Sequence, residues 1–106
     1  MDNTLIVWGS EMGDGWHDYD RYCCLTVGGS WYFRPGRYLH YPDTTDISIY
    51  SGSTGREQTS SGMPYQHRLV SATNAMGLVT DSIGDTEITN TAGTRISLTG
   101  ELEGMV

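Results

Sequence analysis

The sequence predicts an all-β fold, a small antiparallel sandwich or barrel with at most one short helix. The 106 residues include 14 glycines and many serines and threonines, a composition typical of short strands joined by turns. Apolar and polar residues alternate near the C-terminus, which is the period of a half-buried strand. The bulky stretch 21–41 would place apolar side chains on both faces of its strands, as packed sheets do. This length fits one β domain, residues 1–106.

The N-terminal part predicts a short strand followed by an acidic loop. Residues 4–8 form an apolar run, and the polar segment 9–20 follows. The carboxylates of this segment are Glu11, Asp14, Asp18 and Asp20. Their oxygens could converge on a hard cation, but the glycine and the closing glutamate of an EF-hand are missing. We therefore expect a solvated acidic loop and no metal site.

The central stretch predicts a β-hairpin. Gly28 and Gly29 suit a two-residue turn, which would set Leu25 opposite Tyr32 on one face. Proline and glycine at 35–36 then predict a second turn, because proline presets φ and glycine accepts positive φ. An extended segment would resume after it.

The middle of the chain is less regular. Alternation over 47–50 predicts a short half-buried strand. Residues 51–64 are rich in Ser, Gly and Thr and contain one bulky apolar side chain, so we expect a flexible exposed loop. For the next segment we favour strands at 67–72 and 77–80. The alternative is one short helix that ends at Gly77.

The C-terminal part predicts a second hairpin. A three-residue loop over 91–93, with its glycine in the left-handed conformation, would set Ile88 opposite Ile96 and Thr86 opposite Leu98. That register keeps the apolar side chains on one face, whereas a shift by one residue would not.

Charge excludes several classes of function. The formal net charge is −7, from 13 acidic residues and six basic residues, all of them arginine. Direct nucleic-acid binding needs a basic stripe, so it is disfavoured. The absence of lysine removes Schiff-base chemistry and a P-loop lysine. The carboxylates leave one alternative open, an acidic intracellular inhibitor that mimics nucleic acid.

The cysteines and histidines, which often act in catalysis or bind metals, do not show the sequence spacing of a catalytic or metal site. Cys23 and Cys24 are adjacent and would point to opposite faces of a strand as free thiols, as in a reducing cytoplasm. His17, His40 and His67 lie far apart and show no metal-binding spacing. We expect no enzymatic activity, no cofactor and no membrane span, and synthesis in the cytoplasm without a signal peptide.

Aromatic side chains give the clearest indication of function. Trp8, Trp31 and Phe33 are assigned to the core, and the other rings exceed what a small core can hold. The expected partner-binding residues are Trp16, Tyr19, Arg34, Arg37, Tyr38, Tyr41, Tyr50 and Tyr65. Tyrosine, tryptophan and arginine favour a protein interface. Carboxylates near Tyr41 keep a small carbohydrate-binding module as an alternative.

Open sheet edges favour a homo-oligomer, and the apolar residues Met105 and Val106 could complete the sheet of a neighbouring subunit.

The segment TRISLTGELEG, residues 94–104, resembles the TRTISLTGDVTG segment that recurs in tail-fibre and capsid-decoration proteins of tailed bacteriophages. The matching residues are Thr94, Arg95, Ile96, Ser97, Leu98, Thr99, Gly100 and Gly104. Glu101 and Glu103 depart from the usual residues. The resemblance implies a structural virion accessory protein, a capsid decoration or tail component. Its partners would be capsid or tail subunits or a host protein, and it would be incorporated into the virion. No functional residue is implied.

Overall fold

The computed structural model describes residues 3–10, 22–41, 45–52 and 54–106. These residues form strands and one helix in the order β1, β2, β3, β4, α1, β5, β6. The strands pair antiparallel in three two-stranded sheets, β1–β2, β3–β4 and β5–β6. Small antiparallel sheets with one short helix are therefore confirmed. Within the described residues, the sheets form neither a closed barrel nor a sandwich.

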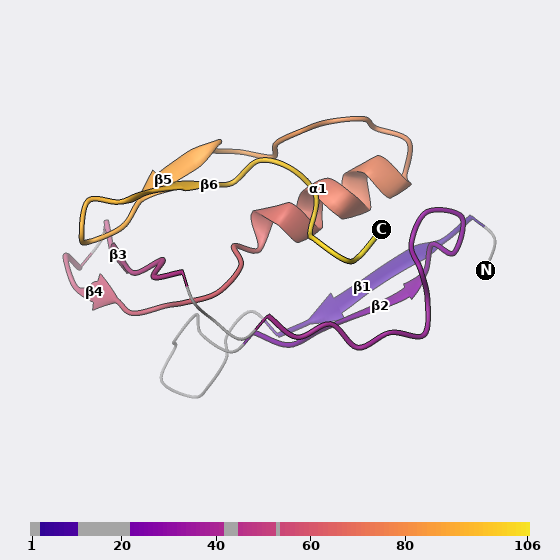
Figure 1. The fold of residues 1–106 in the computed structure, drawn as a ribbon, viewed down its shortest axis with the longest axis horizontal. Helices are drawn as coiled ribbons and strands as arrows, with labels where there is room; N and C mark the ends of the chain where they lie inside the picture. The colour runs from indigo at the N-terminus through magenta and orange to yellow at the C-terminus, as the bar shows by residue number, and fades with distance from the viewer. Residues whose placement is uncertain (1–2, 11–21, 42–44, 53) are drawn as a thin grey trace.

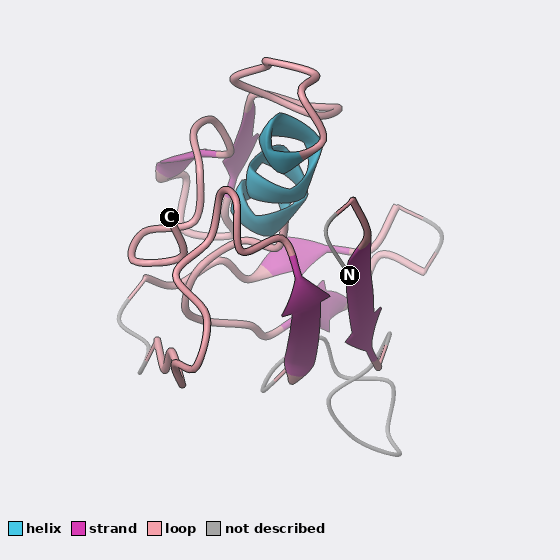
Figure 2. Ribbon diagram, turned by 90° about the vertical axis from the view of Figure 1, so that its right-hand side faces the viewer, coloured by secondary structure: helices cyan, strands magenta, loops and turns pink. Residues whose placement is uncertain are grey.

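The molecule is elongated, with principal extents of 45 × 28 × 24 Å. The β1–β2 sheet lies beside the helix toward one end, whereas β3–β4 and β5–β6 share the other end (Figure 1). Figure 2 looks from the β1–β2 end and shows the helix on one side of this sheet.

The first sheet joins two segments that are distant in sequence. β1 (Leu5–Gly9) confirms the predicted first strand. Its partner is β2 (Cys24–Gly28), and Trp8 lies opposite Leu25. The predicted pairing of Leu25 with Tyr32 is therefore wrong.

The two glycines that suggested a hairpin make a different turn. Gly28 and Gly29 do have positive φ, 87° and 70°. However, the Gly29 carbonyl accepts hydrogen bonds from the backbone N–H groups of Tyr32 (2.9 Å) and Phe33 (2.8 Å). The chain thus curls at the end of β2 instead of starting a paired strand. A Cβ at Gly28 would lie 2.1 Å from the Thr4 carbonyl oxygen, so the close approach of β1 also requires glycine here.

The segment expected to be a flexible loop contributes to a second hairpin. β3 (Ile49–Tyr50) pairs with β4 (Glu57–Gln58), and a bridge between Asp46 and Ser61 extends the pairing. The prediction for residues 51–64 is therefore wrong for β4.

Hydrogen bonds hold the β3–β4 hairpin and the residues before it against the β5–β6 hairpin. The Asn90 side-chain amide donates to the Asp46 carbonyl (2.9 Å), and the Thr91 backbone N–H donates to the Ser48 carbonyl (2.8 Å). The Thr91 hydroxyl also donates to the Glu57 carboxylate (2.7 Å). Within residues 51–64, the bond to Glu57 therefore links β4 to a distant part of the chain.

The C-terminal hairpin has the predicted register. β5 (Glu87–Thr89) pairs with β6 (Arg95–Ser97), and Ile88 lies opposite Ile96. Gly93 has a φ of 86°, the left-handed conformation that the three-residue loop requires.

The ambiguous segment is helical. α1 (Gln66–Ala75) shows that the favoured strands at 67–72 and 77–80 are wrong and that the alternative, one short helix, is correct. Val70 and Ser71 are fully buried on the side of the helix that faces the rest of the chain. Such packing outweighs the modest helix propensity of its β-branched residues.

The core is small. One cluster of it consists of the buried Phe33, Ala75 and Met105, with Leu5, Tyr32 and Leu102 packed against them. The other buried apolar residues among those described are Val70, Ile96 and Leu98. Phe33 is thus in the core as predicted, whereas Trp8 is 67% exposed and Trp31 is 44% exposed. Met105 packs in the core of its own chain.

Candidate functional site

One face of the β1–β2 sheet carries only apolar side chains. Residues directly opposite each other in an antiparallel pair project to the same face. Ile6 lies opposite Val27, and Trp8 lies opposite Leu25, so these four side chains share one face. Their exposed fractions are 45%, 38%, 67% and 54%. We call this surface the outer face.

The opposite face of the sheet is partly covered by the chain itself, although Val7 on that face is 40% exposed. Leu5 packs against the core, and Arg68 of α1 reaches back to β2. The Arg68 guanidinium donates to the Leu25 carbonyl oxygen (3.0 Å) and to the Thr26 hydroxyl (2.7 Å). The helix therefore holds the inner side of the sheet (Figure 2), whereas the four side chains of the outer face stay exposed.

Arg68 is a buried cation that ties the helix to the sheet. It is 7% exposed, and burial lowers its pKa below the ordinary value. Its Nε atom is buried without a hydrogen-bond partner. Keeping a guanidinium in this position carries a desolvation cost, which the two hydrogen bonds to Leu25 and Thr26 offset in part. These bonds tie α1 to β2.

Two tyrosines lie in contact beside Gly9, the last residue of β1. The rings of Tyr22 and Tyr65 meet edge to face, with centroids 5.2 Å apart. The Tyr22 side chain lies directly against Gly9, because a Cβ added at Gly9 would lie 2.5 Å from the tyrosine hydroxyl oxygen. Burial, followed by the neighbouring Tyr65, raises the pKa of Tyr22. Tyr65 therefore lies beside the sheet that carries the outer face.

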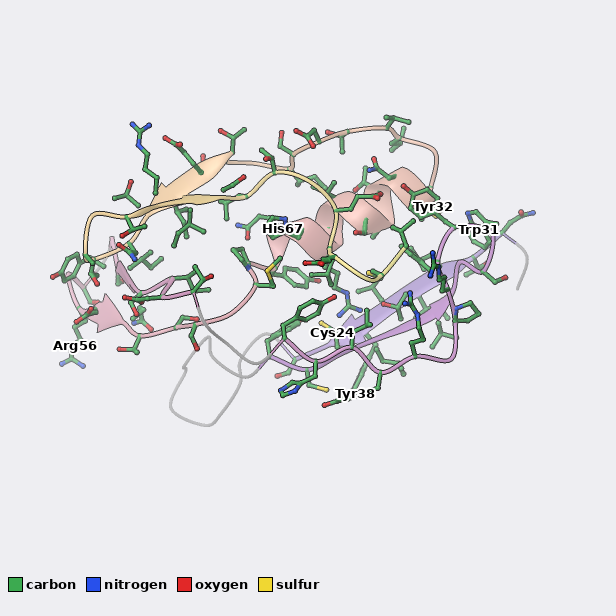
Figure 3. The ribbon with its side chains drawn as sticks, in the orientation of Figure 1. Cys24, Trp31, Tyr32, Tyr38, Arg56 and His67 are labelled. Atoms are coloured by element: carbon green, nitrogen blue, oxygen red, sulfur yellow. The ribbon has the colours of Figure 1, made fainter. Side chains whose placement is uncertain are left out.

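Other predicted partner-binding residues follow β2 in the chain. The Arg37 guanidinium donates to the carbonyl oxygens of Arg34 (3.3 Å) and Met105 (3.4 Å), so it anchors the C-terminus of the chain. Tyr38 is 88% exposed and points away from the ribbon (Figure 3). Its ring lies 6.3 Å from that of His40.

The remaining members of the predicted set do not gather at one place. The Tyr41 hydroxyl donates to the Glu103 carbonyl, and burial raises the pKa of Tyr41. Tyr50 is exposed on β3, at the opposite end of the molecule from the β1–β2 sheet (Figure 1). Trp16 and Tyr19 lie outside the described residues. The described members therefore form no single surface.

Sequence reasoning missed the outer face. Trp8 was assigned to the core, and Ile6, Leu25 and Val27 were not singled out. The signal in the sequence is that both strands carry apolar residues on both faces. A single helix can cover only one side of a two-stranded sheet, so one apolar face must stay exposed.

The described part of the chain does not bring three or more His, Cys, Asp or Glu side chains together as a metal site. Cys23 is exposed and Cys24 is half-buried, both as free thiols. His67 is buried, and its Nδ1 lies 3.1 Å from the Gly100 carbonyl oxygen. The acidic loop and His17 lie outside the described residues. Among the described residues there is no helix with the length and apolar character needed to cross a membrane.

Comparison of the chain with protein-family models, with curated proteins and with solved structures found no match. The outer face is therefore interpreted from its own geometry.

Proposed function

We propose that this chain is a non-enzymatic binding module that attaches to other protein surfaces through the outer face. The observation that carries the proposal is the pairing of Ile6 with Val27 and of Trp8 with Leu25 on the uncovered side of a sheet. A one-sided sheet normally presents polar residues to water, and a contiguous apolar patch marks an interaction site. Covering half of a large apolar side chain contributes about 1 kcal/mol, so four of them supply several kcal/mol.

The more specific form of the proposal is a virion accessory protein, a capsid decoration or tail component. It is supported by the resemblance of residues 94–104 to segments of such proteins. The module would add buried area between neighbouring subunits and stabilise the assembled particle by mass action.

A binding experiment with matched variants tests this function. Purified particles of a virus that encodes the chain are mixed with wild-type protein, with Trp8→Glu, and with Val79→Glu. Val79 is 92% exposed and lies outside the β1–β2 sheet, so it controls for adding a carboxylate at an exposed apolar position. Co-sedimentation should show tight binding for wild type and Val79→Glu. Binding by Trp8→Glu should be at least about tenfold weaker, which corresponds to about 1.4 kcal/mol.

Equal binding by wild type and Trp8→Glu would contradict the proposal. The salt dependence of binding distinguishes the proposed function from the alternative of an acidic inhibitor. The affinity of a contact through an uncharged face should change little between low and high salt. The affinity of an inhibitor that mimics nucleic acid should fall steeply as salt rises.

A further inference from the structure

The two cysteines of the chain are neighbours at the end of the β1–β2 sheet, and the proposed function uses neither of them. Cys23 is exposed and Cys24 is half-buried, and both are free thiols. We infer that they form a redox-sensitive site, at which hydrogen peroxide joins them in a reversible disulfide and releases the end of the sheet. This inference goes beyond the proposed function, because it concerns the free protein and needs no partner at the outer face.

The position of the pair at the start of β2 allows such a disulfide to form. Side chains of adjacent residues in a strand point to opposite faces, whereas the two Cβ atoms of a disulfide lie about 3.5–4.5 Å apart. Cys23 precedes β2 and lies in no strand, so its backbone can turn without breaking a strand pair. Cys24 is the first residue of β2 and pairs with Gly9, the last residue of β1. Closing the disulfide therefore removes only this terminal pair from the sheet.

Exposure decides which thiol reacts first. The exposed sulfur of Cys23 is open to a peroxide from solvent. Its thiolate attacks one peroxide oxygen, the O–O bond breaks, and the hydroxide that leaves takes up a proton, so that Cys23 becomes a sulfenic acid. The thiolate of Cys24 then attacks this sulfur and displaces a second hydroxide, which also becomes water. In total, two thiols are oxidised to one disulfide and one molecule of hydrogen peroxide is reduced to two of water.

A buried arginine is a second, independent indication of this site. Burial lowers the pKa of Arg68, and negative charge on Tyr22 or Cys23 acts in the opposite direction, so the Cys23 sulfur lies within electrostatic reach of the guanidinium. Arg68 is 7% exposed, and its Nε is the one buried side-chain nitrogen or oxygen among the described residues that lacks a hydrogen-bond partner. A sulfenic acid oxygen accepts hydrogen bonds better than a thiol sulfur does. The unpaired N–H of Arg68 can therefore stabilise the sulfenic acid until Cys24 reaches it.

The structural change should stay local. Arg68 holds Leu25 and Thr26, the next two residues of β2, through hydrogen bonds that do not involve the cysteines. The strand pairs beyond the terminal one should therefore remain. Tyr22 directly precedes the pair and lies against Gly9, so this contact should be lost. A disulfide between adjacent residues is strained and easily reduced, which is the property of regulatory disulfides.

Mass spectrometry of the full chain after treatment with hydrogen peroxide tests the inference. Trypsin yields a peptide of residues 22–37 that contains both cysteines, because the bond between Arg34 and Pro35 resists cleavage. In the oxidised monomer this peptide should be lighter by two hydrogen atoms and should resist alkylation until a thiol reductant is added. The nuclear Overhauser contact between the Tyr22 ring and the Gly9 α-protons should disappear on oxidation and return on reduction.

Two variants with a single cysteine assign the steps. Cys24→Ser lacks the second thiol, so it should stop as a sulfenic acid at Cys23, which dimedone traps. Cys23→Ser keeps only the half-buried thiol and should react with peroxide at least about tenfold more slowly than wild type. Both substitutions replace sulfur by oxygen in similar space, and a cooperative thermal transition of each variant checks that it folds.

Three results would overturn the inference. One is a disulfide that links two chains instead of the adjacent cysteines. Another is a Cys23 that is oxidised to a sulfinic acid while Cys24 can still be alkylated. The third is a Cys23→Ser variant that reacts as fast as wild type. None of these experiments measures particle binding, so failure of this inference and failure of the proposed function are separate results.

Discussion

At the scale of residues, a polar network joins the turn after β2 to the helix and the C-terminal segment. The Tyr32 hydroxyl donates to the Glu101 carboxylate, which also accepts a hydrogen bond from the Asn74 amide (2.9 Å). The side-chain Oδ1 of Asn74 in turn accepts from the backbone N–H of Thr80 (2.8 Å). Segments that are distant in sequence thus share one carboxylate, and each depends on the others for its hydrogen bonds.

This network predicts an alkaline limit on stability. The hydrogen bond to Glu101 raises the pKa of Tyr32 above its ordinary value of 10.0. Only the protonated hydroxyl can donate, so the stabilisation is complete below pH 10 and is lost as pH rises through the higher folded-state pKa. Tyr32→Phe should therefore be less stable than wild type by about 1 kcal/mol at neutral pH, because the pair is half-buried and partly screened. The difference should shrink above pH 10.

Denaturant unfolding at a series of pH values measures this difference in the free energy of unfolding. Tyr38→Phe is the control, because the Tyr38 ring is exposed and its hydroxyl makes no hydrogen bond to the described residues. A gap between wild type and Tyr32→Phe that stays constant from neutral to strongly alkaline pH would show that the hydroxyl proton is not involved.

At the scale of elements, the helix ends in a Schellman motif. The N–H of Gly77 donates to the Asn74 carbonyl (2.9 Å), and the N–H of Leu78 donates to the Thr73 carbonyl (3.2 Å). Gly77 has a φ of 83°, a conformation that side chains with a Cβ adopt at a cost.

Gly77→Ala should lower the free energy of unfolding by about 1 kcal/mol. Gly52→Ala is a matched control, because an added Cβ meets no atom within 4 Å at either glycine and only Gly77 has the positive φ. Thermal or chemical unfolding of the two variants isolates the conformational cost. Equal stability of both variants would mean that the helix does not need this ending.

Elements set by local chemistry were predictable from the sequence. The β5–β6 hairpin depends on a three-residue loop and Gly93, both of which can be read directly. The β1–β2 sheet joins segments separated by a long intervening stretch, so no local pattern reveals the pairing. The helix was only the second choice, because the burial of Val70 is decided by packing and not by propensity.

At the scale of the whole molecule, a surplus of aromatic side chains was predictable, but its location was not. Tyr38 and Tyr50 are exposed as the sequence indicates, yet they lie in different parts of the molecule. Trp8 is expected in the core, yet it is 67% exposed. The pattern cannot tell which face the chain covers itself, since that depends on where α1 and Arg68 dock.

The most direct measurement of the central claim follows Trp8 itself. Protein labelled with 5-fluorotryptophan gives fluorine NMR signals for its three tryptophans, and Trp8→Phe assigns the Trp8 signal by its loss. If another protein surface covers the outer face, the Trp8 signal should move with protein concentration or on adding particles, and its H₂O-to-D₂O shift should fall as water is excluded. The signal of Trp31, whose indole N–H donates to the Ala75 carbonyl (2.8 Å), should stay in place. A Trp8 signal that keeps the position and the full solvent shift of an exposed ring under all of these conditions would contradict the claim.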